Sequence, residues 1–235
     1  MKIVWLRMLF ILAVMSSCND TTSDSTRTKI TEGDSCSIIV SNIEFTKSIN
    51  GANESATVVG DKLVLLSSAE QDNFNDPDGK LSSNSAPVLL TPIDNTAPFT
   101  FTAKVTPVLD DTYDAGTLYI YLNPNWWFKF AFEKDERHKN RIVTVRTIDT
   151  SDDNNHDVVD SESVYMKISS DGKTVGFYYS IDNVNWQLVR LFRNDYPTET
   201  WVGLGSQSPI GNGTSVVFED LTLTQSSVED FRMGI

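Results

Sequence analysis

Short hydrophobic runs, many of them alternating with polar residues, recur along most of the chain from about residue 38. Successive residues of a β-strand point to opposite faces of a sheet, so this alternation predicts strands with one apolar and one more polar face. The predicted strands are Ile38–Phe45, Thr57–Leu66, Pro98–Val105, Gly116–Leu122, Trp126–Glu133, Arg141–Ile148, Val164–Ile168, Val175–Ser180, Trp186–Phe192, Trp201–Gly205 and Val216–Leu223.

The segments between these runs are rich in Asn, Asp, Gly and Pro, and no segment shows convincing helical periodicity. Many short strands joined by such turns predict an all-β fold, a sandwich or barrel of antiparallel sheets. No internal repeat is present, and the length suits one domain, which we place at residues 38–235. The polar stretch before it, up to residue 37, predicts a solvated leash.

One strand shows most clearly which side chains share a face. In Trp126–Glu133, the residues Phe128, Phe130 and Phe132 alternate and predict the core face. The opposite face carries Trp127, Lys129 and Glu133, and Tyr119 and Tyr121 occupy one face of the preceding strand. Aromatic planes stack on sugar rings and paired polar groups bind hydroxyls, so we expect this mixed face to suit carbohydrate.

The N-terminus predicts export. Lys2 and Arg7 precede the apolar run from Met8 to Met15, which is too short to span a bilayer and is typical of a secretory signal. Ser16 and Ser17 then lead into Cys18, which resembles a lipobox. Residues 1–17 are therefore a predicted lipoprotein signal peptide, and residues 18–37 a lipidated cysteine with its leash. The alternative is an ordinary signal peptide that contains a cysteine.

An anchor on Cys18 predicts a protein exported to the bacterial cell envelope, with the outer membrane as one destination, and held there by several acyl chains. Cys36 would be the one thiol left, so stability must come from the core rather than from a disulfide. Removing Lys2 and Arg7 takes the formal net charge from −13 to −15. This acidity argues against nucleic acid and polyanionic glycans as partners and favours neutral ligands. The sequence carries no indication of an oligomeric state.

Several short segments together resemble a known family. They are Tyr113-Asp114-Ala115-Gly116, Trp127, Lys129, Glu133, Ser151-Asp152, Ser169-Ser170-Asp171-Gly172, Phe177-Tyr178-Tyr179-Ser180, Asp182, Trp186, Arg190 and Val202-Gly203-Leu204. Their order and spacing, over roughly Asn73 to Thr224, resemble domain-of-unknown-function family 1349, which is also labelled regulation-of-enolase, concanavalin A-like. The resemblance implies a concanavalin A-like jelly-roll sandwich of two antiparallel sheets, and it implies no activity. The enolase label describes a eukaryotic regulatory role and is not carried over.

Two positions depart from the family pattern. Ala131 stands where the family often has glycine, and Asn183 stands where a second glycine usually follows the turn aspartate. Asn tolerates the left-handed backbone that such a turn requires, so the second change is mild. The stretch from Ser180 to Trp186 predicts a structural turn in which Asp182 binds the turn backbone and Trp186 packs beneath it.

Glycoside hydrolysis requires two carboxylates on either side of one bond. The sequence has no Glu-x-Asp-x-x-Glu on a buried strand, and the nearest pair, Glu133 and Asp135, runs into a charged segment that predicts an exposed hairpin tip. An ion pair with Lys129 would keep Glu133 ionised. A second carboxylate brought near Glu133, with Asp152 as the candidate, would favour a hydrolase.

Metal and nucleophile chemistry receive little support. The acidic clusters at residues 72–79 and 149–157 could offer oxygens to structural calcium, but neither matches an EF-hand loop, and solvated loops are the simpler interpretation. His138 and His156 lack zinc-ligand spacing. We predict no catalytic residue, metal or cofactor.

The sequence therefore predicts an envelope lipoprotein whose sandwich domain binds carbohydrate without catalysis. The expected ligand-binding residues are Tyr119, Tyr121, Trp127, Lys129, Glu133 and Asp152. One alternative is a glycoside hydrolase that acts on a small saccharide. The other is a structural envelope protein, in which the protein's own loops would cover this face.

Overall fold

Alternating sequence and frequent turn residues produce strands throughout residues 33–235, the part of the chain that the computed structural model describes. Seventeen strands and one four-residue helix, α1 (Ala52–Ser55), are present there. The predicted signal peptide, Cys18 and the leash up to residue 32 lie outside the described residues. No helix within residues 33–235 has the length and hydropathy that crossing a membrane would require.

Eight antiparallel strands form the larger sheet, which we call sheet A. Their spatial order is β1 (Asp34–Val40), β2 (Ile43–Ile49), β7 (Val88–Asp94), β16 (Glu199–Gln207), β9 (Ala115–Asn123), β10 (Trp126–Lys134), β11 (Asn140–Ile148) and β12 (Thr150–Val158).

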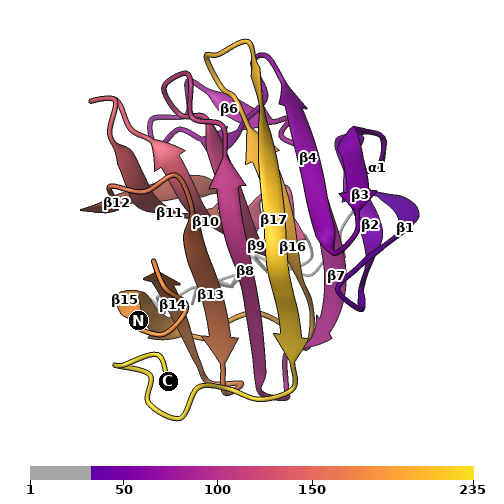
Figure 1. Ribbon diagram of the computed structural model, residues 1–235, viewed down its shortest axis with the longest axis vertical. Helices are drawn as coiled ribbons and strands as arrows, with labels where there is room; N and C mark the ends of the chain where they lie inside the picture. Colours follow the sequence, from indigo (N-terminus) through magenta and orange to yellow (C-terminus); the bar gives the residue numbers. More distant parts are fainter. Residues whose placement is uncertain (1–32) are drawn as a thin grey trace, which may run out of the picture.

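Seven antiparallel strands form sheet B. Their spatial order is β15 (Gln187–Arg193), β14 (Thr174–Ser180), β13 (Val164–Ser170), β8 (Phe99–Pro107), β17 (Gly213–Thr224), β4 (Lys62–Ser68) and β3 (Ala56–Val59). In Figure 1, sheet B lies in front, with the yellow β17 between β8 and β4, and the strands of sheet A lie behind it. The late strand β16 has the same central place in sheet A, between β7 and β9. The all-β, two-sheet antiparallel architecture predicted from the sequence is confirmed.

The core lies between the two sheets, and the predicted inner face of β10 is confirmed. Phe128, Phe130 and Phe132 are fully buried there. Phe177 from β14 lies against two of them, with ring centroids 4.7 Å from Phe128 and 5.1 Å from Phe130. Side chains of this size account for much of the hydrophobic stabilisation of a domain.

Two predicted strands are hairpins instead. Ile38–Phe45 is divided between β1 and β2, because Ser41 and Asn42 have φ values of 51° and 63° and turn the chain back. Thr57–Leu66 is divided in the same way at Gly60, whose φ is 61°. Sheet A also begins at Asp34, so residues 34–37 of the predicted leash belong to a strand.

The predicted turn after β14 is present. The Asp182 carboxylate accepts hydrogen bonds from the backbone N–H groups of Val184 and Asn185, at 2.9 and 2.7 Å. These bonds hold the pKa of Asp182 well below its usual range. Asn183 has a φ of 59°, the left-handed conformation expected there.

Candidate functional site

The outer face of sheet A, which points away from sheet B, is covered in part by the segment 72–86. We call this segment the covering hairpin; it contains β5 (Asn73–Asn75) and β6 (Ser82–Asn84), which pair only with each other among the described strands. Buried polar contacts fix it in place. The amide of Asn73 donates to the Tyr119 hydroxyl at 3.2 Å, and the backbone N–H of Asn75 donates to the hydroxyl of Ser151 at 2.9 Å.

The covering hairpin changes the role of the aromatic residues that the sequence places on this face. Tyr119, Tyr121 and Trp127 do lie on the outer face, but each is at most 1% exposed. They form a second hydrophobic cluster against which Phe74 of the hairpin and Trp201 pack. The Trp127 indole N–H donates to the carbonyl oxygen of Pro124 at 3.0 Å. The expected open aromatic platform was therefore wrong at these three positions.

A pocket of about 660 Å³ remains beside the hairpin, over β10, β11 and β12. Pockets of this volume are typical of small-molecule sites. Its walls combine apolar side chains with several carboxylates. The residues that line it are Glu70, Asp72, Phe74, Leu81, Ser83, Tyr113, Lys129, Glu133, Glu136, Val143, Val145, Asp153, Asn155, Gln207, Pro209 and Ile210.

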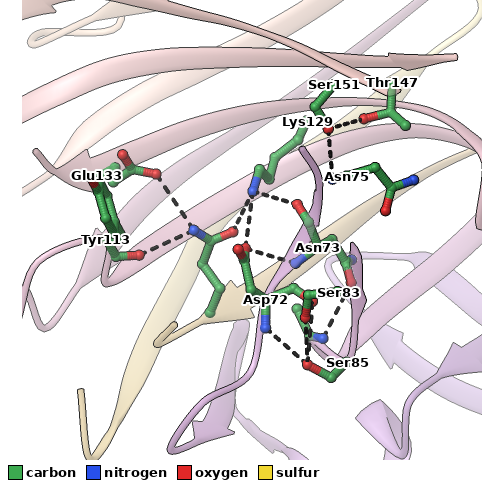
Figure 2. A network of polar contacts seen from close by, with 12 residues as sticks. Asp72, Asn73, Asn75, Ser83, Ser85, Tyr113, Lys129, Glu133, Thr147 and Ser151 are labelled. Carbon is green, nitrogen blue, oxygen red and sulfur yellow. Dashed lines mark hydrogen bonds and ion pairs between the residues drawn. The ribbon is translucent and has the colours of Figure 1, made fainter. Parts of the chain in front are cut away.

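Lys129 is the one basic side chain among the described residues that line the pocket, and it is 2% exposed. Its ammonium donates to the carbonyl oxygen of Asn73 and to Oε1 of Gln207, both at 2.8 Å, and pairs with Asp72 at 3.4 Å. Figure 2 shows Lys129 reaching toward Asp72 and Asn73. Burial opposes the charge on Lys129, but Asp72 and other anionic neighbours outweigh it and raise the pKa.

The predicted ion pair between Lys129 and Glu133 is replaced by the pair between Lys129 and Asp72. Glu133 is 7% exposed, and its Oε2 lies 3.5 Å from the amide nitrogen of Gln207. Burial raises the pKa of Glu133 to about 8, since Lys129 only partly offsets the desolvation and nearby carboxylates such as Asp153 add to it. Glu133 is therefore largely a neutral carboxylic acid near pH 7, rather than the ionised group that the sequence suggested.

The second carboxylate of the pocket is Asp153, not the predicted Asp152. Register places Asp153 opposite Val145, which is itself opposite Lys129, so these side chains share the outer face. Asp152 belongs to the other face, where it pairs with Arg190 of β15 at 3.2 Å. Desolvation at the pocket wall raises the pKa of Asp153, although its side chain is solvent-exposed.

Tyr113 is the aromatic residue at the pocket mouth that the sequence analysis did not place in the site. It is 38% exposed and has a φ of 69°, which is uncommon for an aromatic residue. Its backbone N–H donates to the carbonyl oxygen of Lys134 at 2.7 Å, and its carbonyl oxygen accepts from the amide of Gln207 at 3.1 Å. The next residue, Asp114, is fully buried and accepts from the Ser208 hydroxyl at 2.6 Å. These contacts fix the Tyr113 backbone at the rim.

The two acidic clusters are not the solvated loops that the sequence suggested. Residues 72–79 begin the covering hairpin, and residues 150–158 form the edge strand β12. Within residues 33–235 no group of three or more His, Cys, Asp or Glu side chains is placed to hold a metal ion. The charged segment after Glu133 forms the turn between β10 and β11, where buried Asp135 accepts from Arg141 at 2.7 Å.

Comparison with known proteins identifies the family. The family described as "Protein of unknown function (DUF1349)" matches residues 49–226. The chain belongs to this family. No curated protein matches it.

Solved structures similar to this member of the family support the same fold. A functionally unknown protein from Saccharomyces cerevisiae superposes with a TM-score of 0.70 at 19% identity, over 77% of this chain and 97% of that one. The GH43 protein BlXynB from Bacillus licheniformis superposes with a TM-score of 0.59 at 14% identity, over 74% of this chain and 35% of that one. Lectin I-B4 from Griffonia simplicifolia gives a TM-score of 0.50 at 13% identity, over 72% and 90% of the two chains.

These similarities show a concanavalin A-like jelly-roll sandwich, as the resemblance implied. The chain spans only about a third of the length of the BlXynB chain, and all three identities are below 20%. They therefore establish the fold of this family member, and its function has to be argued from the pocket.

Proposed function

We propose that the pocket beside the covering hairpin binds an uncharged saccharide without catalysis. The observation that carries this proposal is the combination of an exposed aromatic ring, Tyr113, with convergent polar groups in one cavity of about 660 Å³. Sugar rings present an apolar face that stacks on aromatic side chains and hydroxyls that need hydrogen-bond partners. Lectin and glycoside hydrolase chains among the structures of similar fold support the proposal as analogy.

The lining residues include two kinds of side chain, and both suit such a ligand. Phe74, Val143 and Val145 provide apolar wall, and Glu133 and Gln207 provide hydrogen-bonding groups. A structural envelope protein was expected to have this face covered by its own loops. The covering hairpin does bury the aromatic residues at one side, but it leaves the pocket open beside them, which favours the binding function.

A glycan array probed with the full chain carrying Cys18→Ser tests the proposal, with calorimetry on each hit. Tyr113→Ala should weaken binding of a hit at least tenfold while the fold is retained, because Ala accepts the same backbone as Tyr and only the ring is lost. Tyr165→Ala is the matched control, because Tyr165 lies on sheet B outside the pocket. Equal binding by wild type and Tyr113→Ala would place the ligand elsewhere, and the absence of any hit would remove the proposal.

A second candidate, hydrolysis of a small saccharide, is favoured by the raised pKa of Glu133, since a general acid must be protonated at the working pH. Register separates the Cα atoms of Glu133 and Asp153 by two strands and four residues, roughly 16 Å. The separation of the two carboxyl groups themselves would decide between a retaining mechanism, at ~5 Å, and an inverting one, which needs a wider spacing. The test is incubation with aryl glycosides. Release of the aryl group by wild type, and none by Glu133→Gln, would establish hydrolysis.

We also propose the lipid anchor at Cys18, from the signal-like sequence before it. Cys18→Ser should release the protein from the membrane fraction and leave the β-sandwich folded, because Cys18 precedes the first strand by sixteen positions. Metabolic labelling with palmitate measures this directly. Label that persists in Cys18→Ser would show that another residue carries the anchor.

A further inference from the structure

Lys129, the one cation among the described residues of the pocket wall, has no donor left for a ligand. Its ammonium carries three N–H groups, and three protein acceptors surround it: the carbonyl oxygen of Asn73, Oε1 of Gln207 and a carboxylate oxygen of Asp72. Two of these acceptors belong to the covering hairpin, so the ammonium is committed to holding the hairpin on sheet A. Lys129 offsets the charge of Asp72, and the carboxylates of Glu70, Glu136 and Asp153 still give a ligand in the pocket an acidic wall.

Gln207 lies between Lys129 and Glu133 and contacts both side chains. Because Oε1 of Gln207 accepts from Lys129, its amide nitrogen must face the other way, toward the carbonyl oxygen of Tyr113 at 3.1 Å and Oε2 of Glu133 at 3.5 Å. Figure 2 shows Glu133 and Tyr113 on the same side of this network. Oε2 of Glu133 is then an acceptor for Gln207, which leaves the proton of a neutral Glu133 on Oε1.

Both basic and acidic groups surround Glu133, and the acidic ones favour its protonated form. On its own strand it has Lys129, and across β11 it has Arg141, whose guanidinium is paired with Asp135. Four carboxylates line the same pocket from other elements: Glu70 and Asp72 beside the hairpin, Glu136 after β10 and Asp153 on β12. Burial, with these carboxylates adding to it, raises the pKa of Glu133 to about 8.

We infer that Glu133, oriented by Gln207, donates a hydrogen bond from its neutral carboxyl group to an acceptor oxygen of the saccharide, and that the pocket thereby selects uncharged glycans and rejects uronic acids. The inference rests on the proposed saccharide function and adds to it a specificity-determining residue and a ligand class. An anionic sugar would face the carboxylates of Glu70, Glu136 and Asp153, while the one cation among the described lining residues is already paired with Asp72. An uncharged sugar can accept the proton that Glu133 offers.

Binding should then depend on pH in a way that follows the proton on Glu133. With a pKa of about 8, nearly all of this residue is neutral at pH 6.5 and about one part in thirty at pH 9.5, so the apparent affinity should fall about thirtyfold between them. Calorimetric titrations with xylotriose, cellotriose and mannotriose at both pH values measure this. Trigalacturonic acid is the anionic probe of the same length and should bind at least tenfold more weakly than the best neutral trisaccharide.

Three variants isolate the carboxyl proton. Glu133→Gln keeps an N–H donor that cannot titrate, so it should bind about threefold more weakly than wild type at pH 6.5, keep that affinity at pH 9.5, and there bind about tenfold more tightly than wild type. Glu133→Leu removes the donor, so at both pH values it should bind at least tenfold more weakly than wild type does at pH 6.5. Glu162→Gln is the matched control, because it removes an exposed carboxylate outside the pocket and should keep the thirtyfold pH dependence.

The outcomes separate the two proposals. If no saccharide binds at either pH, the proposed function is overturned and this inference with it. If a neutral trisaccharide binds with a Tyr113-dependent but pH-independent affinity, the function stands and the role of Glu133 is overturned. That role is also overturned if trigalacturonic acid binds best.

A carboxyl ¹³C titration of the wild type tests the inference without any ligand. The Glu133 signal, assigned by its loss in Glu133→Gln, should show a midpoint near 8, and an ordinary midpoint near 4.5 would overturn the inference.

Discussion

The two faces of β10 are both buried, but by different means and with different consequences. On the inner face, Phe128, Phe130 and Phe132 are covered by sheet B, and the contacts are apolar. On the outer face, Trp127, Lys129 and Glu133 are covered or flanked by the covering hairpin, and the contacts of Lys129 are polar. A face covered by a whole sheet forms the core. A face covered by one hairpin keeps a cavity, and in that cavity buried charges and a protonated acid persist.

Phe130→Ala should cause the largest loss of stability of the variants that test this comparison. Removing a fully buried ring from between the sheets creates a cavity, and we expect a loss of about 3–5 kcal/mol in the free energy of unfolding. Chemical denaturation measures it. A loss no larger than that of Lys129→Met would mean that the two faces do not differ as described.

Lys129→Met should reduce the free energy of unfolding by less than Phe130→Ala, and it should loosen the covering hairpin in particular. The change keeps an unbranched side chain, one atom shorter, and leaves the buried partners of the ammonium unpaired, for which we expect a loss of about 2–3 kcal/mol. Hydrogen exchange should rise at residues 72–86 more than at β8 or β13. A uniform rise across both sheets would show that Lys129 supports the core and not the hairpin.

The free energy of unfolding should fall as the pH rises toward the pKa of Glu133. The pKa of Glu133 is raised on folding from 4.5 to about 8, so the folded state binds more protons between these values, and stability declines as pH rises from about 5 to 8. Between these pH values we expect wild type to lose about 2 kcal/mol of stability more than Glu133→Gln does. This is less than the full pKa shift implies, since water in the pocket can solvate the anion. Urea denaturation of both proteins across this range measures the difference. Parallel pH profiles would contradict the burial of a neutral acid.

Asp182→Ala should give the smallest loss of stability, because Asp182 lies in an exposed turn after β14, on sheet B, and not on either face of β10. The carboxylate is depressed in pKa by backbone hydrogen bonds, so its contribution is present above its unfolded pKa and is lost as pH falls toward the acid range. The midpoint of thermal unfolding should drop less than in the other variants at pH 7, and the difference from wild type should vanish in acid. Glycan binding should be unchanged.

Alternation in the sequence was enough to predict most strands and the inner face, because the period of two depends only on strand geometry. It did not reveal β12, whose sequence TSDDNNHDV is polar, since an edge strand can be held by backbone pairing alone. Nor did it reveal the hairpin turns at Ser41 and Gly60. Their residues adopt positive φ, yet the hydrophobic runs continue through them.

The candidate site was predicted in part. The shared face of Lys129 and Glu133 followed from alternation, but whether that face is open depends on the covering hairpin, which comes from sequence some fifty residues earlier. Which of Asp152 and Asp153 faces the pocket depends on the pairing of β12 with β11, where Asp153 lies opposite Val145, and the uniformly polar sequence of β12 does not encode that pairing. The alternation of Trp201, Gly203 and Gly205 into Gln207 was the signal that could have placed Gln207 on the outer face.

The central positions of β16 and β17 have a consequence for how the chain folds. Before residues 199–224 are available, β7 and β9 have no neighbour between them in one sheet, and neither do β8 and β4 in the other. Neither sheet is therefore continuous until the same late segment is in place, and most native contacts join residues far apart in sequence. Loop closure on this scale is entropically costly, so we expect a high contact order and refolding on the millisecond-to-second timescale or slower. A nascent chain would remain without a closed sheet until nearly all of it had been made, the condition in which an unfolded polypeptide can still be threaded through a translocation channel.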